Sequence, residues 1–260
     1  MLLYFQKRSE PKMKNKVETS QSQLVVKSNS LIQKTRYELS TEEQKLILYL
    51  VSLIKPQDSE LQEYHIDIKK VCSIFGIQEK GSNYAYLRQC LRGLSDKSFW
   101  ISTPEKDLLI RWLERLEINK FETYVSCRLD DRLKPFLLQL KECFTSYELC
   151  YVLALKTKTA IRLYEIFNSY AYKQAVVISL EELRSMFSLE NKYPLYNDFK
   201  RYILDKAIKE INEFTDLIIN YEPVRQQKAV TAIKFNIKKL QNDEVSKQIA
   251  IEQIKNKESI

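Results

Sequence analysis

Apolar and polar residues recur along the first half of the chain with periods that predict helices and short strands. The first helix is predicted to begin at Ser40, because a serine N-cap three residues before Glu43 forms a capping box. Apolar residues at helical spacing continue it to Ile54. The next predicted elements are a strand at 64–68, a small helix closed by Gly76, a helix at 82–97, strands at 99–102, 108–119 and 122–129, and a short helix at 132–140. This order of helix, strand, helix, turn, helix and β-hairpin is typical of a winged helix.

The same order begins again at Thr157, where a second apolar helix face starts. Its predicted successors are a strand at 176–178, a helix opened by Ser179, a long helix at about 196–214, strands at 217–221 and 232–237, and a turn at 223–228. In the long helix, Phe199 and Ile203 are expected to point inward. The second half therefore predicts a second winged helix.

An internal repeat supports this interpretation. The apolar positions of 66–77 match those of 178–189 at a constant offset of 112 residues. After a five-residue insertion the match continues at an offset of 117, which makes Trp100 equivalent to Leu217. We expect one fold to occur twice, in an α+β protein of two tandem winged-helix domains. The predicted division is a disordered arm or cloning remnant at 1–22, the first domain at 23–142, the second at 143–240 and a polar C-terminal tail at 241–260.

Composition favours a polyanionic partner. The chain has 42 Lys and Arg against 34 Asp and Glu, a net charge of +8, and nucleic acid is the leading candidate. Five cysteines without a C-x-x-C pair are read mostly as small core residues in a reducing compartment. No apolar run approaches the roughly 20 residues of a membrane span. We expect a cytoplasmic protein with no membrane contact.

Residues for common catalytic and metal chemistry are scarce. Three scattered glycines cannot supply a phosphate-cradling loop, and the single histidine, His65, excludes paired-histidine metal sites. Neither paired Cys/His spacing nor a Ser-His-Asp arrangement is evident, and His65 is interpreted as a structural residue. We expect no enzymatic activity, no metal and no cofactor.

The second domain carries the better DNA-binding residues. In a helix-turn-helix the second helix enters the major groove, and an inward-pointing Phe199 leaves Asn197, Lys200 and Arg201 on its outer face. Arg201 is the best candidate for reading bases. The expected wing contacts are Arg225, Gln226, Gln227 and Lys228, and the expected backbone contacts at the start of the domain are Lys156, Lys158 and Arg162. The equivalent helix of the first domain offers Asn83, Tyr86 and Arg88 on a less positive surface, for which we expect a weaker role.

Several short motifs follow one another along the chain, namely Val26–Leu31, Leu87–Leu91, Ile161–Glu165, Phe199–Arg201 and Glu210–Asn212. Together and in this order they resemble the iteron-binding initiator (Rep) proteins of theta-replicating plasmids, in a likeness that spans about residues 24–240. The resemblance implies a bacterial protein whose first domain forms a homodimer and whose second domain reads direct repeats at the plasmid origin. It also implies autorepression by dimers at an operator, and contacts with a host initiator and helicase. The family's recognition cations fall on Lys200 and Arg201, whereas Tyr202 stands where a further cation can occur.

Two alternatives stay open at this point. A tandem winged-helix transcriptional repressor would share the fold, the charge and the binding residues, and direct repeats rather than one inverted repeat beside the gene would distinguish the initiator. An endonuclease with winged-helix domains would need a metal-binding carboxylate cluster, and none is evident in the sequence.

Overall fold

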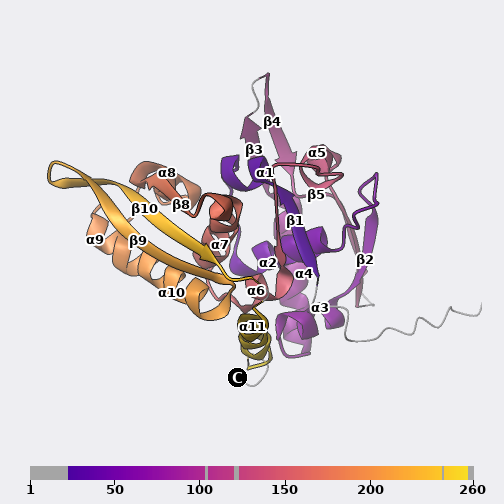
Figure 1. The fold of residues 1–260 in the computed structure, drawn as a ribbon. Coiled ribbons are helices and arrows are strands. Elements are labelled where there is room, and N and C mark those ends of the chain that lie inside the picture. The colour runs from indigo at the N-terminus through magenta and orange to yellow at the C-terminus, as the bar shows by residue number, and fades with distance from the viewer. Residues whose placement is uncertain (1–22, 103–104, 120–122, 242, 257–260) are drawn as a thin grey trace, which may run out of the picture.

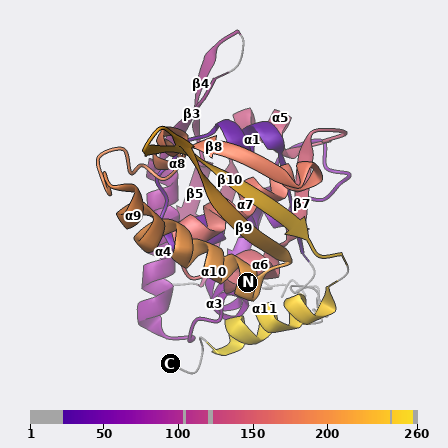
Figure 2. The same ribbon diagram turned by 60° about the vertical axis from the view of Figure 1, so that its left-hand side comes forward.

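Two three-stranded sheets, each beside a pair of helices, organise the computed structural model, which describes residues 23–102, 105–119, 123–241 and 243–256 (Figures 1 and 2). The arm predicted at 1–22 lies outside the described residues. The α+β fold class and the tandem winged-helix arrangement are both confirmed.

The first lobe comprises β1 (Leu24–Ser28), α1 (Asn29–Lys34), α2 (Thr41–Ser52), β2 (Glu63–Asp67), α3 (Ile68–Phe75), α4 (Gly81–Asp96), β3 (Ser98–Ser102), β4 (Asp107–Arg111), β5 (Leu113–Ile118), β6 (Tyr124–Leu129), the 3-10 turn η2 (Asp131–Leu133), α5 (Lys134–Leu137) and β7 (Phe144–Glu148). Helix α2 begins as predicted, since Ser40 Oγ accepts from the Glu43 N–H and the Glu43 carboxylate accepts from the Ser40 N–H. Gly76 ends α3 with a left-handed φ of 64°, which glycine adopts without strain.

The connecting and second-lobe elements are α6 (Leu149–Ala154), α7 (Lys158–Tyr170), the 3-10 turn η3 (Ala171–Lys173), β8 (Ala175–Ser179), α8 (Leu180–Met186), α9 (Tyr196–Phe199), the π turn η4 (Lys200–Leu204), α10 (Asp205–Phe214), β9 (Leu217–Gln226), β10 (Ala229–Lys239) and α11 (Glu244–Asn256). Strand β7 pairs with β1, joining the two ends of the first lobe. The exact domain limits stay a prediction.

The repeat is visible in the strand order. The sheets run β2-β6-β5 and β8-β10-β9, so in each lobe the strand before the helix pair lies against the second strand of the wing. Ile66 faces Val125 in one sheet and Ile178 faces Ile233 in the other. The equivalence of Trp100 and Leu217 is wrong, because Trp100 lies in an additional hairpin, β3–β4, that forms its own sheet. Strand β9, which begins at Leu217, occupies the place of β5, which begins at Leu113.

The second wing is longer than predicted. Strand β9 continues to Gln226 and β10 resumes at Ala229, so only Gln227 and Lys228 form the turn. Gln227 takes a φ of 55° there. Pro223 lies within β9, which is an edge strand of its sheet, the place in a sheet where proline is tolerated.

The long helix predicted at 196–214 is continuous but contains the π turn η4. Phe199 is fully buried, as expected, but the next fully buried side chain is Leu204, and Ile203 is only half-buried. A π turn adds one residue to a helical turn, which shifts the inward position from Ile203 to Leu204.

The polar tail predicted at 241–260 forms a docked helix, α11, over residues 244–256. Ala250 and Ile254 are buried on its inner face, where α11 contacts α6 and α10. The backbone of Ile254 also reaches the first lobe, because a Cβ added at Gly76 would lie 1.9 Å from the Ile254 carbonyl oxygen. Residues 244–256 are therefore part of the folded body.

Four cysteines, Cys72, Cys90, Cys127 and Cys150, are buried free thiols, in agreement with the core role predicted for most of them, whereas Cys143 is exposed. Burial raises the pKa of the Cys90 thiol to about 11.

Candidate nucleic-acid interface

The long helix and the wing of the second lobe lie on the same side of that lobe. In Figure 1 the helix α9–α10 runs beside the hairpin β9–β10, whose tip extends past α9. In winged-helix proteins the second helix contacts the groove and the wing adds contacts to the DNA backbone. The side chains of these two elements therefore decide what the surface can bind.

Arg201 and Asn197 are exposed on the long helix, as predicted. The Arg201 guanidinium lies 5.4 Å from the ring centre of the neighbouring Tyr202, and Lys206 approaches the same ring at 5.6 Å. Tyr202 is 42% exposed and stands against Tyr193, with ring centres 5.9 Å apart. Two cations thus gather around one exposed aromatic ring on the outer surface of the helix.

Lys200 is half-buried and already has a protein partner. Its Nζ donates to Asp205 Oδ2 at 2.8 Å and lies 5.9 Å from the Tyr221 ring centre. The hydrogen bond with Asp205 raises the pKa of Lys200, so the ammonium stays charged. Because 44% of its side chain remains exposed, Lys200 can still meet a phosphate, but it must share its charge with Asp205.

The predicted wing residues are all exposed at the tip of the hairpin. Arg225 and Gln226 end β9, and Gln227 and Lys228 form the turn. Arg225 Nη1 donates to the Lys228 carbonyl at 3.2 Å, which bridges the two sides of the tip. Two cations and two amides therefore project together into solvent.

Two of the three cations predicted at the start of α7 are accessible. Lys156 and Lys158 are exposed, the first with its Nζ 5.2 Å from the Phe214 ring centre and the second 3.6 Å from Glu38. The Glu210 carboxylate accepts the backbone N–H groups of Lys156 and Thr157, at 2.8 and 3.1 Å. This contact ties the start of α7 to the long helix α10.

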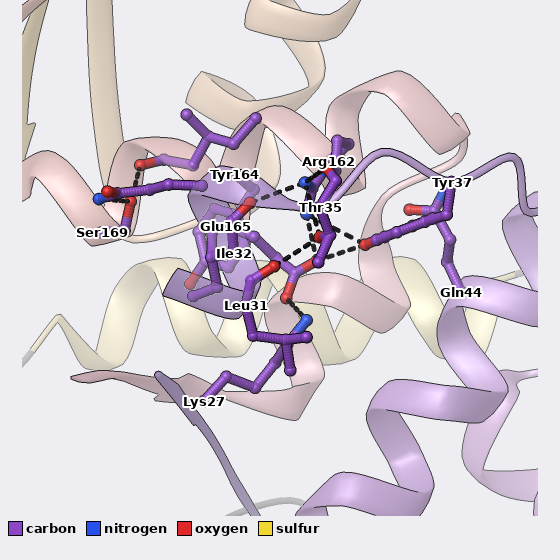
Figure 3. A network of polar contacts seen from close by, with 12 residues as sticks. Lys27, Leu31, Ile32, Thr35, Tyr37, Gln44, Arg162, Tyr164, Glu165 and Ser169 are labelled. Carbon is purple, nitrogen blue, oxygen red and sulfur yellow. Dashed lines mark hydrogen bonds and ion pairs between the residues drawn. The ribbon is translucent and has the colours of Figure 1, made fainter. Parts of the chain in front are cut away.

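Arg162 is a wrong prediction as a DNA contact. It is 3% exposed, and its guanidinium donates to the carbonyl oxygens of Ile32 at 2.7 Å and Thr35 at 2.8 Å (Figure 3). It also lies over the Tyr37 ring, 4.7 Å from its centre. The α-helical spacing places Arg162 on the face of α7 that packs against the first lobe, where no phosphate can reach it.

The residues predicted in the first lobe make intramolecular contacts. The Asn83 amide donates to the Gln78 carbonyl at 2.9 Å, and the Tyr86 hydroxyl donates to Glu42 at 3.1 Å. Arg88 is half-buried. These contacts hold α4 against α2 and the preceding loop, and a role in DNA binding for the three residues stays a prediction.

The remaining features of the described residues concern metal ligands, the single histidine and membrane-spanning helices. Within that part, no group of three or more His, Cys, Asp or Glu side chains could hold a metal ion. His65 is exposed on β2, with Nδ1 2.7 Å from Ser126 Oγ. No described helix has the length and apolar character that a membrane crossing requires.

Comparisons with known proteins agree with this architecture. Residues 24–168 match the family described as "Initiator Replication protein, WH1", and residues 179–237 match "Initiator Rep protein, WH2". A "Replication initiation protein" of Escherichia coli is 25% identical over 251 residues, which cover 86% of this chain and 78% of the relative. The "PI protein" of Escherichia coli is 29% identical over 132 residues, which cover 45% of this chain and 43% of that protein.

One solved structure shares the fold over most of both chains. It is the Pi initiator protein in complex with iteron DNA, with a TM-score of 0.70, 18% identity and coverage of 86% of this chain and 99% of that chain. Lys206, which approaches the Tyr202 ring together with Arg201, was not predicted from the sequence, because it lies beyond the N-terminal half of the helix that a helix-turn-helix presents to the groove.

Proposed function

Because the chain belongs to the family of initiator replication proteins with WH1 and WH2 domains, we propose that it initiates plasmid replication by binding directly repeated sites in double-stranded DNA at the origin. The repeats are iterons of the kind named in the structure of the Pi initiator. The protein acts in the bacterial cytoplasm and needs neither a cofactor nor a catalytic step of its own.

The observation that carries this proposal is the shared exposure of a basic helix and a basic wing tip on one side of the second lobe. Arg201 and Asn197 supply the side chains for base edges, and Lys200 adds a cation beside them. Arg225 and Lys228 lie at the wing tip, where phosphates and the minor groove are within reach. Lys156 and Lys158 extend the positive surface along the DNA backbone.

The first lobe has a different role in the proposal. Its long helix α4 carries Asn83, Tyr86 and Arg88, and the side chains of Asn83 and Tyr86 make hydrogen bonds within the lobe, so we assign this helix the weaker DNA contact. We assign homodimer formation to this domain, with dimers repressing the initiator gene at an operator and monomers binding the repeats. Host initiator and helicase proteins are the expected further partners.

DNase footprinting on the DNA that flanks the gene tests the proposal. We expect protection of several direct repeats, spaced by about two helical turns. Deleting those repeats from a plasmid that depends on this gene should abolish its maintenance. Protection of one inverted repeat, with unchanged plasmid maintenance, would instead identify a transcriptional repressor.

Incubation with Mg²⁺ and supercoiled plasmid tests the absence of catalysis. We expect the plasmid to stay supercoiled. Nicking that disappears when a carboxylate is replaced would overturn the assignment as a non-enzymatic initiator.

A further inference from the structure

A leucine is displayed in solvent at the start of the long helix. Leu195 is the N-cap residue of α9, and it is 66% exposed. Its neighbours along the helix include the exposed Asn197 and Arg201. An exposed leucine beside polar residues of a binding surface can contribute only apolar contact to a ligand.

The loop that carries Leu195 is held in place by buried and half-buried groups. Arg184 donates to the carbonyl oxygens of Tyr193 at 3.1 Å and Pro194 at 3.0 Å, and its guanidinium lies 5.5 Å from the ring centre of the buried Phe199. Tyr193, with a φ of 53°, rests against Tyr202. The loop is thus fixed from both sides, and the exposure of Leu195 is a defined feature of the surface.

The chemistry of the major groove identifies one apolar group that suits this leucine. Donors and acceptors line the groove, and the C5-methyl group of thymine is the apolar feature among them. In helix-turn-helix proteins the N-terminal residues of the second helix contact base edges. Leu195 stands at that end of the helix, ahead of Asn197.

We propose that Leu195 recognises a thymine methyl group in the bound repeat and so contributes to sequence specificity. This inference rests on the proposed function, because it requires α9 to enter the major groove. Arg184 is the positioning residue, since its hydrogen bonds to the Tyr193 and Pro194 carbonyl oxygens hold the loop.

Replacement of single thymines by deoxyuridine tests the proposal, because it removes only the methyl group. The full chain is first used to select binding sites from random-sequence duplexes. Each thymine of the selected duplex is then replaced in turn, and Kd is measured by fluorescence anisotropy. We expect about a fourfold loss at one or two positions, the factor associated with burying one methyl group.

Variants locate the contact on the protein. Leu195→Ala should bind the thymine duplex about fourfold more weakly than the wild type. Replacing the sensitive thymine by deoxyuridine should then cause no further loss of affinity in this variant. At all other positions the deoxyuridine replacements should affect Leu195→Ala and the wild type equally. Leu195→Met should keep the discrimination. Val177→Ala is the matched control, because Val177 is 57% exposed on β8, away from the long helix and the wing tip. Urea unfolding of each variant verifies that the fold is intact.

The outcomes distinguish a failure of the Leu195 contact from a failure of the proposed function. If specific binding is insensitive to every deoxyuridine, or if Leu195→Ala keeps the wild-type profile, the leucine contact is wrong while the proposed function stands. If selection enriches no sequence, the proposed function fails and the leucine contact fails with it. A leucine that serves a protein partner would give the first of these results.

Discussion

At the scale of single residues, a buried network of charges joins β1 to α7 (Figure 3). Lys27 is 2% exposed, and its Nζ lies 2.7 Å from an oxygen of Glu165, which is 1% exposed. The Tyr147 hydroxyl donates to the same oxygen at 2.7 Å. Buried charges are stable only when they are paired and hydrogen-bonded, and here the pairing links residues 138 positions apart.

Removing the carboxylate should leave an uncompensated cation in this network. We expect Glu165→Gln to lower the free energy of unfolding by about 3–5 kcal/mol at pH 7, as measured by urea titration. The double variant Lys27→Met/Glu165→Gln should recover part of the loss, because both buried partners are then neutral. A loss under 1 kcal/mol for the single variant would show that water or a rearranged side chain compensates the cation.

The same residue predicts a pH dependence. Burial alone would raise the pKa of Glu165, but the charges of Lys27 and Arg162, together with the hydrogen bonds from Lys27 and Tyr147, outweigh burial and lower the pKa below 4.5. The contribution of Glu165 is therefore present above pH 4.5 and is lost as the pH falls through the lower pKa of the folded state. Glu165→Gln should lack this part of the acid destabilisation, and urea titrations on both sides of pH 4.5 measure the difference.

Two exposed cations should affect DNA binding in different ways. Arg201→Ala is expected to cost about 1–3 kcal/mol on specific DNA and little on random DNA, since a base contact is lost. Lys228→Ala should weaken binding to all sequences alike and reduce the slope of log K against log salt by about one. Anisotropy titrations over a range of salt concentrations measure both effects. Equal losses on specific and random DNA for Arg201→Ala would contradict its assignment as a base reader.

At the scale of the elements, helices α2 and α4 pack closely at Gly93. A Cβ added at Gly93 would lie 2.3 Å from Glu43 Oε1. The Glu43 carboxylate completes the capping box of α2 and accepts from Lys97 Nζ at 2.6 Å. Because Gly93 has no side chain, the Glu43 carboxylate has room to complete the capping box and to accept from Lys97.

Alanine at this position should displace Glu43. We expect Gly93→Ala to lower the free energy of unfolding by about 1–3 kcal/mol in urea, because overpacking outweighs the better helix propensity of alanine. Gly81→Ala is the matched control in the same helix, since no atom lies within 4 Å of its added Cβ, and we expect no loss. Equal stability of the two variants would mean that Glu43 moves aside freely.

At the scale of the whole molecule, α7 and α11 connect the two lobes. Helix α7 contacts α1, α2 and β7 on the first-lobe side and α10 and β10 on the second-lobe side. On the latter side the Tyr164 hydroxyl donates to Asp216 at 2.8 Å. Helix α11 lies along α6 and α10 and reaches Gly76 through Ile254 (Figure 2). The relative position of the lobes thus depends on α7, the first helix of the second winged helix, and on α11, which follows that winged helix in the chain.

A charge on the inner face of α11 should release this helix. Ala250 is fully buried, so Ala250→Glu is expected to lower the free energy of unfolding by about 1–3 kcal/mol. Amide hydrogen exchange should increase at residues 244–256 and around Gly76. Val245→Glu is the control, because Val245 is 69% exposed on the same helix. Unchanged exchange at residues 244–256 in Ala250→Glu would contradict the docking of α11.

The sequence by itself determined the elements and their repetition. Local sequence patterns predict those features that depend on contacts within a few residues. These are the helix starts at Ser40 and Thr157, the end of α3 at Gly76 and the alternation of apolar and polar residues in the strands. The turn pattern at the wing likewise predicted that the residues from Arg225 to Lys228 are exposed. Arg201 was also predicted correctly to be exposed, because Phe199, two residues earlier, fixes the inward face of the helix and Arg201 lies on the opposite side.

The tertiary structure decided which charges meet solvent and which segments dock. Arg162 is a cation near the start of a DNA-binding domain, but its guanidinium donates to carbonyl oxygens more than 120 residues away in the sequence. No local sequence pattern covers such a separation. The π turn, the separate β3–β4 hairpin and the docked α11 likewise depend on packing between segments that are distant in the sequence. Local hydrogen bonds define where an element begins and ends, whereas the burial of each face depends on what the rest of the chain brings against it.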